Sequence, residues 1–374
     1  MQTNRNTLDF VKLNVRSRLQ VVRELYRADS RPWIVAFSGG KDSTAALQLI
    51  WLALRDLSTG GAHKPVYVCY VDTGMEHPAY DSKVRATLSE IGEAAELQGL
   101  PMHVRMLEPE LKNRYFVCVI GRGYAPPTHW FRWCTRNLRI KPMSNFIRTQ
   151  ISLSGEVVIV LGLRRTESGA RSRVMDKYKS DRPFTGPYGG LARATAFTPI
   201  EDFGTEHVWQ FLMQTPCPWG ADNRGLVQLY AQAAGGECPS YSAGDRLAPS
   251  CGGSRFGCWT CTVVRKDRSG GSLAEVNEAY EMLVDFRDWL AEMRYDPRRR
   301  WRKRRNGRPG PGPLTIATRR EAFERLLSIE AGSGCTLITP KEVHRIAELW
   351  AKDGGNGRGA IVRYETHLRE SVRS

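Results

Sequence analysis

The chain has 374 residues, of which 41% are hydrophobic and 25% are charged, an ordinary composition for a globular protein. It carries 55 Lys and Arg against 39 Asp and Glu, a formal charge of +16 that favours polyanionic partners, although a generally basic protein without such a partner shows the same balance. Because no apolar run is long enough to span a bilayer and the N-terminus lacks the apolar core of a secretory signal, we expect a cytoplasmic protein that makes no membrane contact.

The first 200 residues alternate between amphipathic segments and short apolar segments. The periodicity predicts helices over 9–27, 44–54 and about 80–97, and strands over 33–37, 66–71, 101–107 and 157–161. Strands separated by helices predict an α/β fold with a doubly wound, mostly parallel sheet, although the strand order cannot be read from the sequence. Ligands bind such sheets at the carboxyl ends of the strands, where three polar loops fall.

Beyond residue 199 the pattern changes to helices and loops. A helix through 208–212 closes the sheet domain, 235–254 is rich in Gly, Ser and Pro, and an apolar face predicts one helix over 273–294. We therefore divide the chain into an N-terminal helix (1–30), a nucleotide-binding sheet domain (31–215), a Cys-rich segment (216–270) and a helical, basic C-terminal region (271–374).

A glycine-rich loop joins the first predicted strand to the next helix. Its paired glycines let the backbone turn tightly and aim N–H groups at a phosphate, and the following helix N-terminus and Lys41 add positive charge. The spacing does not fit a Walker A loop. The alternative is an accidental Gly-Gly turn that carries a surface lysine. The loop consists of Ser38, Gly39, Gly40, Lys41, Asp42 and Ser43.

This Ser-Gly-Gly-Lys-Asp-Ser run resembles the signature of the PP-loop enzymes, which split ATP between its α and β phosphates. The resemblance implies that the loop holds the β and γ phosphates, with Lys41 and Asp42 catalytic and Asp42 acting through Mg²⁺. The loop of Asp72, Thr73 and Gly74 resembles one that borders the nucleotide in the phosphoadenylylsulfate-reductase branch. A later Arg-rich loop of that branch is matched by Gly162, Arg164, Arg165 and Arg171. The guanidinium groups of Arg164 and Arg165 would stabilise charge at the α-phosphate, or alternatively form surface salt bridges.

The cysteines cluster toward the middle of the chain. Four of the nine fall between Cys238 and Cys261, and a cytosolic chain keeps its thiols reduced, so we expect a metal or iron–sulfur site and not disulfides. Cys258-x-x-Cys261, with Cys251 seven residues upstream and the distant Cys134, makes four thiolates that suit either zinc or a [4Fe–4S] cluster. A redox pair and buried structural thiols are the other interpretations.

Two longer runs separate these choices. Residues 133–142, around Cys134, are similar to a loop of sulfonucleotide reductases, and residues 249–267 resemble the DndC family of DNA phosphorothioation enzymes, or its counterpart SspD in the related single-strand system. The family implies a [4Fe–4S] cluster on Cys134, Cys251, Cys258 and Cys261, with Cys238 as a substitute ligand or persulfide carrier. It also implies that ATP adenylates a DNA phosphate, that a cysteine desulfurase supplies the sulfur, and that other phosphorothioation proteins take part.

Other functions stay open at this point. A sulfonucleotide reductase typically carries a Glu-Cys-Gly tail, whereas Glu237-Cys238 is internal here and is followed by Pro239, which counts against sulfate reduction. Thiolation of tRNA bases is a second alternative, and a DNA-binding scaffold that uses ATP only as a switch is a third.

A dense basic run lies in the helical C-terminal region. Such a density of charge binds a phosphodiester backbone, and its single tryptophan would stack on an unpaired base, unless the run is only a solvated charged segment. The run comprises Arg298, Arg299, Arg300, Trp301, Arg302, Lys303, Arg304 and Arg305.

Overall fold

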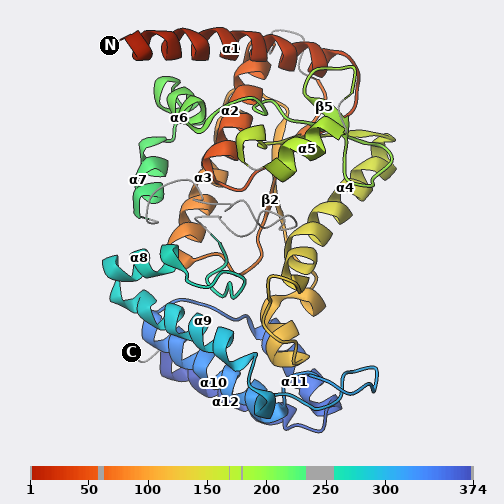
Figure 1. The fold of residues 1–374 in the computed structure, drawn as a ribbon, viewed down its shortest axis with the longest axis vertical. Coiled ribbons are helices and arrows are strands. Elements are labelled where there is room, and N and C mark those ends of the chain that lie inside the picture. Colours follow the sequence, from red (N-terminus) through yellow and green to blue (C-terminus); the bar gives the residue numbers. More distant parts are fainter. Residues whose placement is uncertain (1, 58–62, 168, 178–179, 233–256, 372–374) are drawn as a thin grey trace.

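The computed structural model describes residues 2–57, 63–167, 169–177, 180–232 and 257–371 (Figure 1). Its centre is a six-stranded sheet in the order β3-β2-β1-β4-β6-β5. The strands are β1 (Trp33–Ala36), β2 (Val66–Val71), β3 (Met102–Leu107), β4 (Val157–Leu161), β5 (Thr185–Pro187) and β6 (Ala194–Phe197). All neighbours pair in parallel except β5 with β6. The predicted α/β fold with a mostly parallel sheet is confirmed.

Helices cover both faces of this sheet, as buried parallel strands require. One core packs the sheet against α1 (Gln2–Arg27), α2 (Lys41–Arg55), α3 (Pro78–Leu97) and α6 (Thr205–Gln214). A smaller core packs the opposite face, including Ile34 and Ile159, against α4 (Lys141–Ser154). Two further helices complete this part of the chain: α5 (Gly169–Lys177) comes between β4 and β5 in the sequence, and α7 (Arg224–Gln232) follows α6.

A second, mostly helical core lies beside the sheet (Figure 1). Its C-terminal helices are α8 (Arg268–Val276), α9 (Glu281–Met293), α10 (Ile316–Ser333), α11 (Pro340–Lys352) and α12 (Gly357–Ser371), joined by the short turns η5 (Glu278–Tyr280) and η6 (Pro297–Arg299). Residues 115–138 pack into this core, although the sequence placed them in the sheet domain. This stretch follows η1 (Leu111–Asn113), contains the π-helical turn η2 (Val117–Gly121) and leads into the π-helical turn η3 (Thr135–Ile140). Trp350 Nε1 donates to the Ile120 carbonyl at 2.8 Å and fixes the two parts together.

Three helix boundaries differ from the sequence-based expectations. The single helix predicted over 273–294 is wrong, because the chain leaves helical geometry at Asn277 (φ −145°, ψ 106°), whose side chain accepts from the N–H of Ala279. An apolar stripe continues through the break, so periodicity alone does not detect it. α1 begins at Gln2 and α2 at Lys41, both earlier than predicted. None of the helices in the described ranges is long and apolar enough to cross a membrane.

Candidate nucleotide and cysteine site

The predicted phosphate loop lies where β1 ends and α2 begins. Gly39 has φ +74°, and a Cβ there would meet Val84 Cγ2 at 2.6 Å, so only glycine fits this turn. The hydroxyl of Ser43 donates to the Gly40 carbonyl at 2.9 Å and accepts from the N–H of Ser38 at 3.2 Å, which closes the loop on itself. The first N–H groups of a helix have no intrahelical partners, so α2 directs its positive end toward this loop.

Asp42 joins two cations next to the loop. Its Oδ2 accepts from Lys41 Nζ and its Oδ1 from Arg164 Nε, both at 2.8 Å. The side chain of Arg164 is 1% exposed, and its Nη1 also donates to Thr166 and Thr205. The Arg-rich loop after β4 therefore contacts the phosphate loop through Arg164. Contact of Asp42 with Mg²⁺ stays a prediction.

Gly162 makes this meeting possible. A Cβ at this position would lie 2.6 Å from the carbonyl oxygen of Asp42 and 2.8 Å from the nitrogen of Ser43. These are backbone atoms of α2, which cannot move aside as a flexible side chain can. The end of β4 therefore packs directly against the first turn of α2, and this contact determines the position of Arg164.

Other predicted residues of the arginine loop lie elsewhere. Arg165 forms ion pairs with Asp176 and with Glu201, the latter at 3.2 Å, so it takes the salt-bridge alternative and does not meet Asp42. These two carboxylates raise the pKa of Arg165, with the hydrogen bond to Asp176 as the larger cause. The side chain of Arg171 lies outside the described part of the chain.

Two tyrosines that the sequence did not single out support the loop. The Tyr80 hydroxyl donates to the Ser38 carbonyl, and the Tyr230 hydroxyl accepts from the N–H of Lys41 at 3.1 Å. Tyr80 lies in the first turn of α3, directly after a polar loop, which was a usable signal. Tyr230 comes from α7, far along the chain, and no local pattern marks it.

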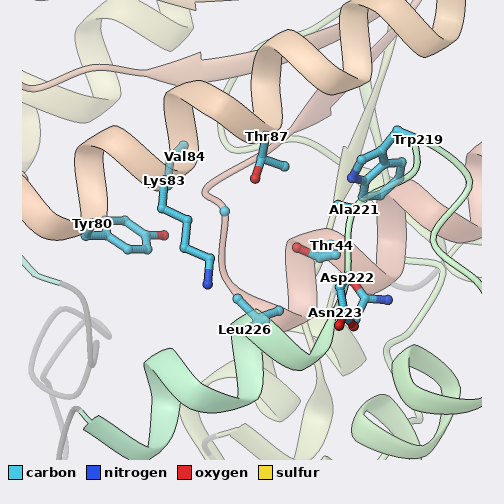
Figure 2. Close-up of a pocket in the computed structure, with 11 residues that line it drawn as sticks. Thr44, Tyr80, Lys83, Val84, Thr87, Trp219, Ala221, Asp222, Asn223 and Leu226 are labelled. Atoms are coloured by element: carbon cyan, nitrogen blue, oxygen red, sulfur yellow. The ribbon is translucent and has the colours of Figure 1, made fainter.

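A small pocket lies behind the loop, between α3 and residues 219–226 (Figure 2). Its volume of ≈ 40 Å³ is far below the roughly 300–1,000 Å³ of ordinary ligand sites, so it is a packing gap and not the place of a nucleotide. Lys83 Nζ reaches across it and donates to the carbonyl of Gly225. This pocket is therefore not the nucleotide site that the phosphate loop predicts.

The loop after β2 carries the link to the cysteines. Asp72 accepts from the N–H of Gly74 at 2.8 Å, and the hydroxyl of Thr73 donates to Glu76 at 2.8 Å. Glu76 forms a β-bridge with Cys258, and the N–H of Trp259 donates to the Met75 carbonyl at 2.9 Å. The Cys258–Cys261 turn is therefore attached to the loop that the sequence placed beside the nucleotide.

Glu76 is a buried carboxylate at this junction. Burial raises its pKa, and Arg139, whose Nη2 lies 3.5 Å from Glu76 Oε1, opposes that rise. The same Nη2 lies 3.9 Å from the sulfur of Cys258. Arg139 thus joins the carboxylate and the thiol, a role that its place in the predicted Cys134 loop did not reveal.

Two arginines, the buried Arg287 of α9 and Arg294 directly after this helix, fix the other end of the cysteine turn. Arg287 Nε donates to the Cys261 carbonyl at 2.8 Å, and its terminal nitrogens donate to the carbonyls of Val264 and Arg265. Arg294 Nη1 donates to the carbonyl of Thr262 at 2.6 Å. The turn has little regular structure of its own, so these bonds define its shape.

Three of the four predicted cluster ligands lie near one buried phenol. Burial raises the pKa of Tyr115 well above its usual value, and the neighbouring thiols of Cys134, Cys261 and Cys258 raise it further. Burial also raises the pKa of Cys258 to about 12, and Arg139 opposes this rise. Cys251 and Cys238 lie outside the described residues.

The thiols fit a soft metal centre chemically, because a cation relieves the mutual repulsion of neighbouring thiolates. Within the described ranges, however, no group of three or more His, Cys, Asp or Glu side chains is arranged to hold a metal ion. The cluster therefore stays a prediction.

The residues of the predicted basic run lie in different surroundings. Arg298 pairs with Asp296, and Arg299 pairs with Glu321. Arg300 and Arg305 instead border a groove beside residues 124–141. Trp301 is 52% exposed.

The sequence matches a known protein family over most of its length. Residues 32–264 match the family described as the phosphoadenosine phosphosulfate reductase domain. An uncharacterized protein of Methanocaldococcus jannaschii is 24% identical over 204 residues, which make up 54% of this chain and 36% of that protein. The chain thus spans about a third of the curated relative that it matches.

Solved structures resemble the chain more weakly. A phosphoadenylyl-sulfate reductase from Candida auris has a TM-score of 0.35 at 11% identity, covering 56% of this chain and 84% of that chain. An NAD⁺ synthetase from Burkholderia pseudomallei has a TM-score of 0.35 at 12% identity, covering 76% and 88%. A U34-tRNA thiolase from Methanococcus maripaludis with its [4Fe–4S] cluster has a TM-score of 0.33 at 12% identity, covering 73% and 80%. Similarity this low supports no transfer of a substrate or cofactor to this chain.

Proposed function

This chain belongs to the phosphoadenosine phosphosulfate reductase domain family, and we propose that it is a PP-loop ATP pyrophosphatase that activates a DNA backbone phosphate for sulfur insertion. The family match supports the PP-loop class. The DNA substrate rests on the DndC-like run at 249–267 and on the positive charge of the chain.

The observation that carries the proposal is the attachment of the cysteine turn to the nucleotide loop. The N–H of Trp259 and the Met75 carbonyl hold the Cys258–Cys261 turn against the loop of Asp72 at the carboxyl edge of the sheet. ATP activation and sulfur insertion have to act on the same DNA phosphate group, so their residues have to lie on adjoining loops. A protein that only bound nucleotide would have no need for this junction.

In the first step, a non-bridging oxygen of DNA attacks the α-phosphorus of ATP. A bond forms between that oxygen and the α-phosphorus, the bond to the β-bridging oxygen breaks, and pyrophosphate leaves. Lys41 and the N–H groups of the loop neutralise the pyrophosphate, while Arg164 stands next to them with its guanidinium already oriented by Asp42. The protein's contribution is alignment and charge neutralisation.

In the second step, sulfur replaces AMP. The terminal sulfur of a persulfide from a cysteine desulfurase attacks the DNA phosphorus, and the bond to the adenylyl oxygen breaks. A second thiol then cleaves the sulfur–sulfur bond, which leaves sulfur on phosphorus and produces a disulfide that an external thiol reduces.

Cys134, Cys258 and Cys261, with Cys251, would hold a [4Fe–4S] cluster in this proposal, and Cys238 would substitute for one ligand or carry the persulfide. A cluster held by only three of these thiolates would supply an iron site for the sulfur that is transferred. Arg139 and Glu76 would position the Cys258 side of that site.

The test is an anaerobic incubation of the protein with ATP, Mg²⁺, DNA and a desulfurase charged with cysteine. We expect pyrophosphate and AMP in equal amounts, and phosphorothioate in nuclease digests analysed by mass spectrometry. Asp42→Ala should abolish all three products while leaving the ultraviolet–visible spectrum of the protein unchanged. Sulfite release from a sulfonucleotide with thioredoxin would instead establish the second candidate, a reductase, which the family match favours. Sulfur transfer to tRNA would make RNA the substrate.

A further inference from the structure

A groove of ≈ 820 Å³ lies between residues 124–141 and the loop of residues 300–313. Its rim carries two aromatic side chains that face solvent, Trp130 at 87% exposure and Phe131 at 57%. Large apolar side chains exposed this far are usually buried when a partner is bound. The nucleotide chemistry described above uses neither of them.

The same groove concentrates positive charge. Five of its lining residues are cationic, and its lining residues include no carboxylate. Mutual repulsion among these charges is relieved by an anion. The cations are Arg132, Arg136, Lys141, Arg300 and Arg305.

The second wall of the groove is held rigidly. Arg300 Nε donates to the Gly312 carbonyl at 2.8 Å, and Arg305 donates to the carbonyl of Arg122. The N–H of Leu314 donates to the Gly123 carbonyl at 2.7 Å, which ties the loop to the opposite wall. The groove is therefore a formed site and not a gap between two loose loops.

Hydrogen bonds connect the groove to the cysteine turn. The hydroxyl of Thr262 donates to the Pro127 carbonyl at 2.7 Å, and Arg294 Nη1 donates to the same carbonyl at 2.6 Å. Trp133, in the groove wall, stacks on Tyr115 with ring centroids 5.6 Å apart and immediately precedes Cys134. A ligand in the groove would thus lie beside the cysteines.

We propose that this groove binds an unpaired segment of DNA, with bases stacked on Trp130 and Phe131 and phosphates on the surrounding cations. Aromatic rings stack on the faces of bases, which are accessible only where a strand is unpaired, whereas a duplex would use the cations alone. This inference rests on the proposed function and deepens it, because it names single-stranded DNA as the form of the substrate. It also moves the aromatic contact from Trp301, which does not line the groove, to Trp130.

The experiment measures binding of a fluorescein-labelled oligothymidylate by fluorescence anisotropy, with a duplex of equal length beside it. Trp130→Ala should weaken single-strand binding by about 10-fold or more and duplex binding much less. Arg136→Gln should make the negative slope of log K against log salt shallower by about 0.7 for the single strand. Arg148→Gln, on the exposed face of α4, is the matched charge control and should leave the slope unchanged. Trp301→Ala is the matched aromatic control.

The inference is overturned if Trp130→Ala and Phe131→Ala bind oligothymidylate as the wild type does, or if Trp301→Ala loses as much affinity as Trp130→Ala. It is also overturned if the aromatic variants lose equal affinity for duplex and single strand. Because Trp130 is exposed, its variants should keep the wild-type urea midpoint. Phosphorothioate formed at the wild-type rate by Trp130→Ala would refute the groove and leave the proposed function standing. Groove-dependent binding without phosphorothioate in the wild type would refute the function and leave the groove.

Discussion

Replacing Gly162 by alanine should separate the two loops that form the nucleotide site. The new Cβ would lie 2.6 Å from the Asp42 carbonyl oxygen, whereas ordinary contact begins at 3.4 Å, so the end of β4 and α2 have to part by about 0.8 Å. Overpacking of this kind costs about 1–3 kcal/mol of unfolding free energy. Because Arg164 follows on the same loop, its guanidinium shifts with it, and a displacement near 1 Å costs up to about 100-fold in rate.

The assay for Gly162→Ala combines urea unfolding with pyrophosphate release at saturating ATP and DNA. The matched control is Gly169→Ala, later in the same segment, where a Cβ would meet nothing within 4 Å. We expect Gly169→Ala to keep the wild-type rate and stability. A Gly162→Ala variant that released pyrophosphate at the wild-type rate would refute the role assigned to the contact between β4 and α2.

Three further changes probe the same account. Asp42→Asn leaves the buried charge of Arg164 without its carboxylate and should lower the unfolding free energy by about 3–5 kcal/mol in urea titrations. Arg287→Met removes the donors to three carbonyls around Cys261 and should cost about 3 kcal/mol while speeding anaerobic thiol labelling of that turn. Burial lowers the pKa of His77 to about 4, below its unfolded value of 6.5, so protonation favours unfolding as the pH falls through this window. Relative to neutral pH, the wild type at pH 5 should have lost about 2 kcal/mol of unfolding free energy. His77→Asn, which has no titrating group at this position, should retain this free energy.

Each of these changes has a control on an exposed residue. Asp176→Asn removes an exposed partner of Arg165 and should change stability by less than about 0.5 kcal/mol. Arg325→Met and His103→Asn, both exposed, should leave thiol labelling and the pH dependence as in the wild type. If a control and its test variant changed stability, thiol labelling or pH dependence equally, burial of the residue would not determine the size of the effect.

The strands and the phosphate loop could be predicted because each depends on local sequence. The strand at 66–71 is a continuous apolar run, and Gly39-Gly40-Lys41 sits between a strand and a helix, so periodicity and turn chemistry suffice. The break at Asn277 was missed because apolar spacing continues across it, while a single side-chain cap decides the geometry.

Long-range contacts could not be read from the sequence. Tyr230 reaches Lys41 from a helix almost two hundred residues away, and Trp259 meets Met75 through backbone atoms, which carry no residue signature. The sequence suggested equal roles for Arg164 and Arg165, but only the fold shows that successive side chains diverge to Asp42 and to Glu201. The groove was missed because Trp130 and Arg305 come together only in three dimensions.

The most direct test of the central claim is to identify the bond of ATP that the protein breaks. ATP labelled separately at the α and γ phosphates, incubated with Mg²⁺, single-stranded DNA and a desulfurase charged with cysteine, should give AMP and pyrophosphate in equal amounts, and Asp42→Ala should give neither. ADP and inorganic phosphate as the products would contradict the assignment of Ser38–Ser43 as a loop for α–β cleavage.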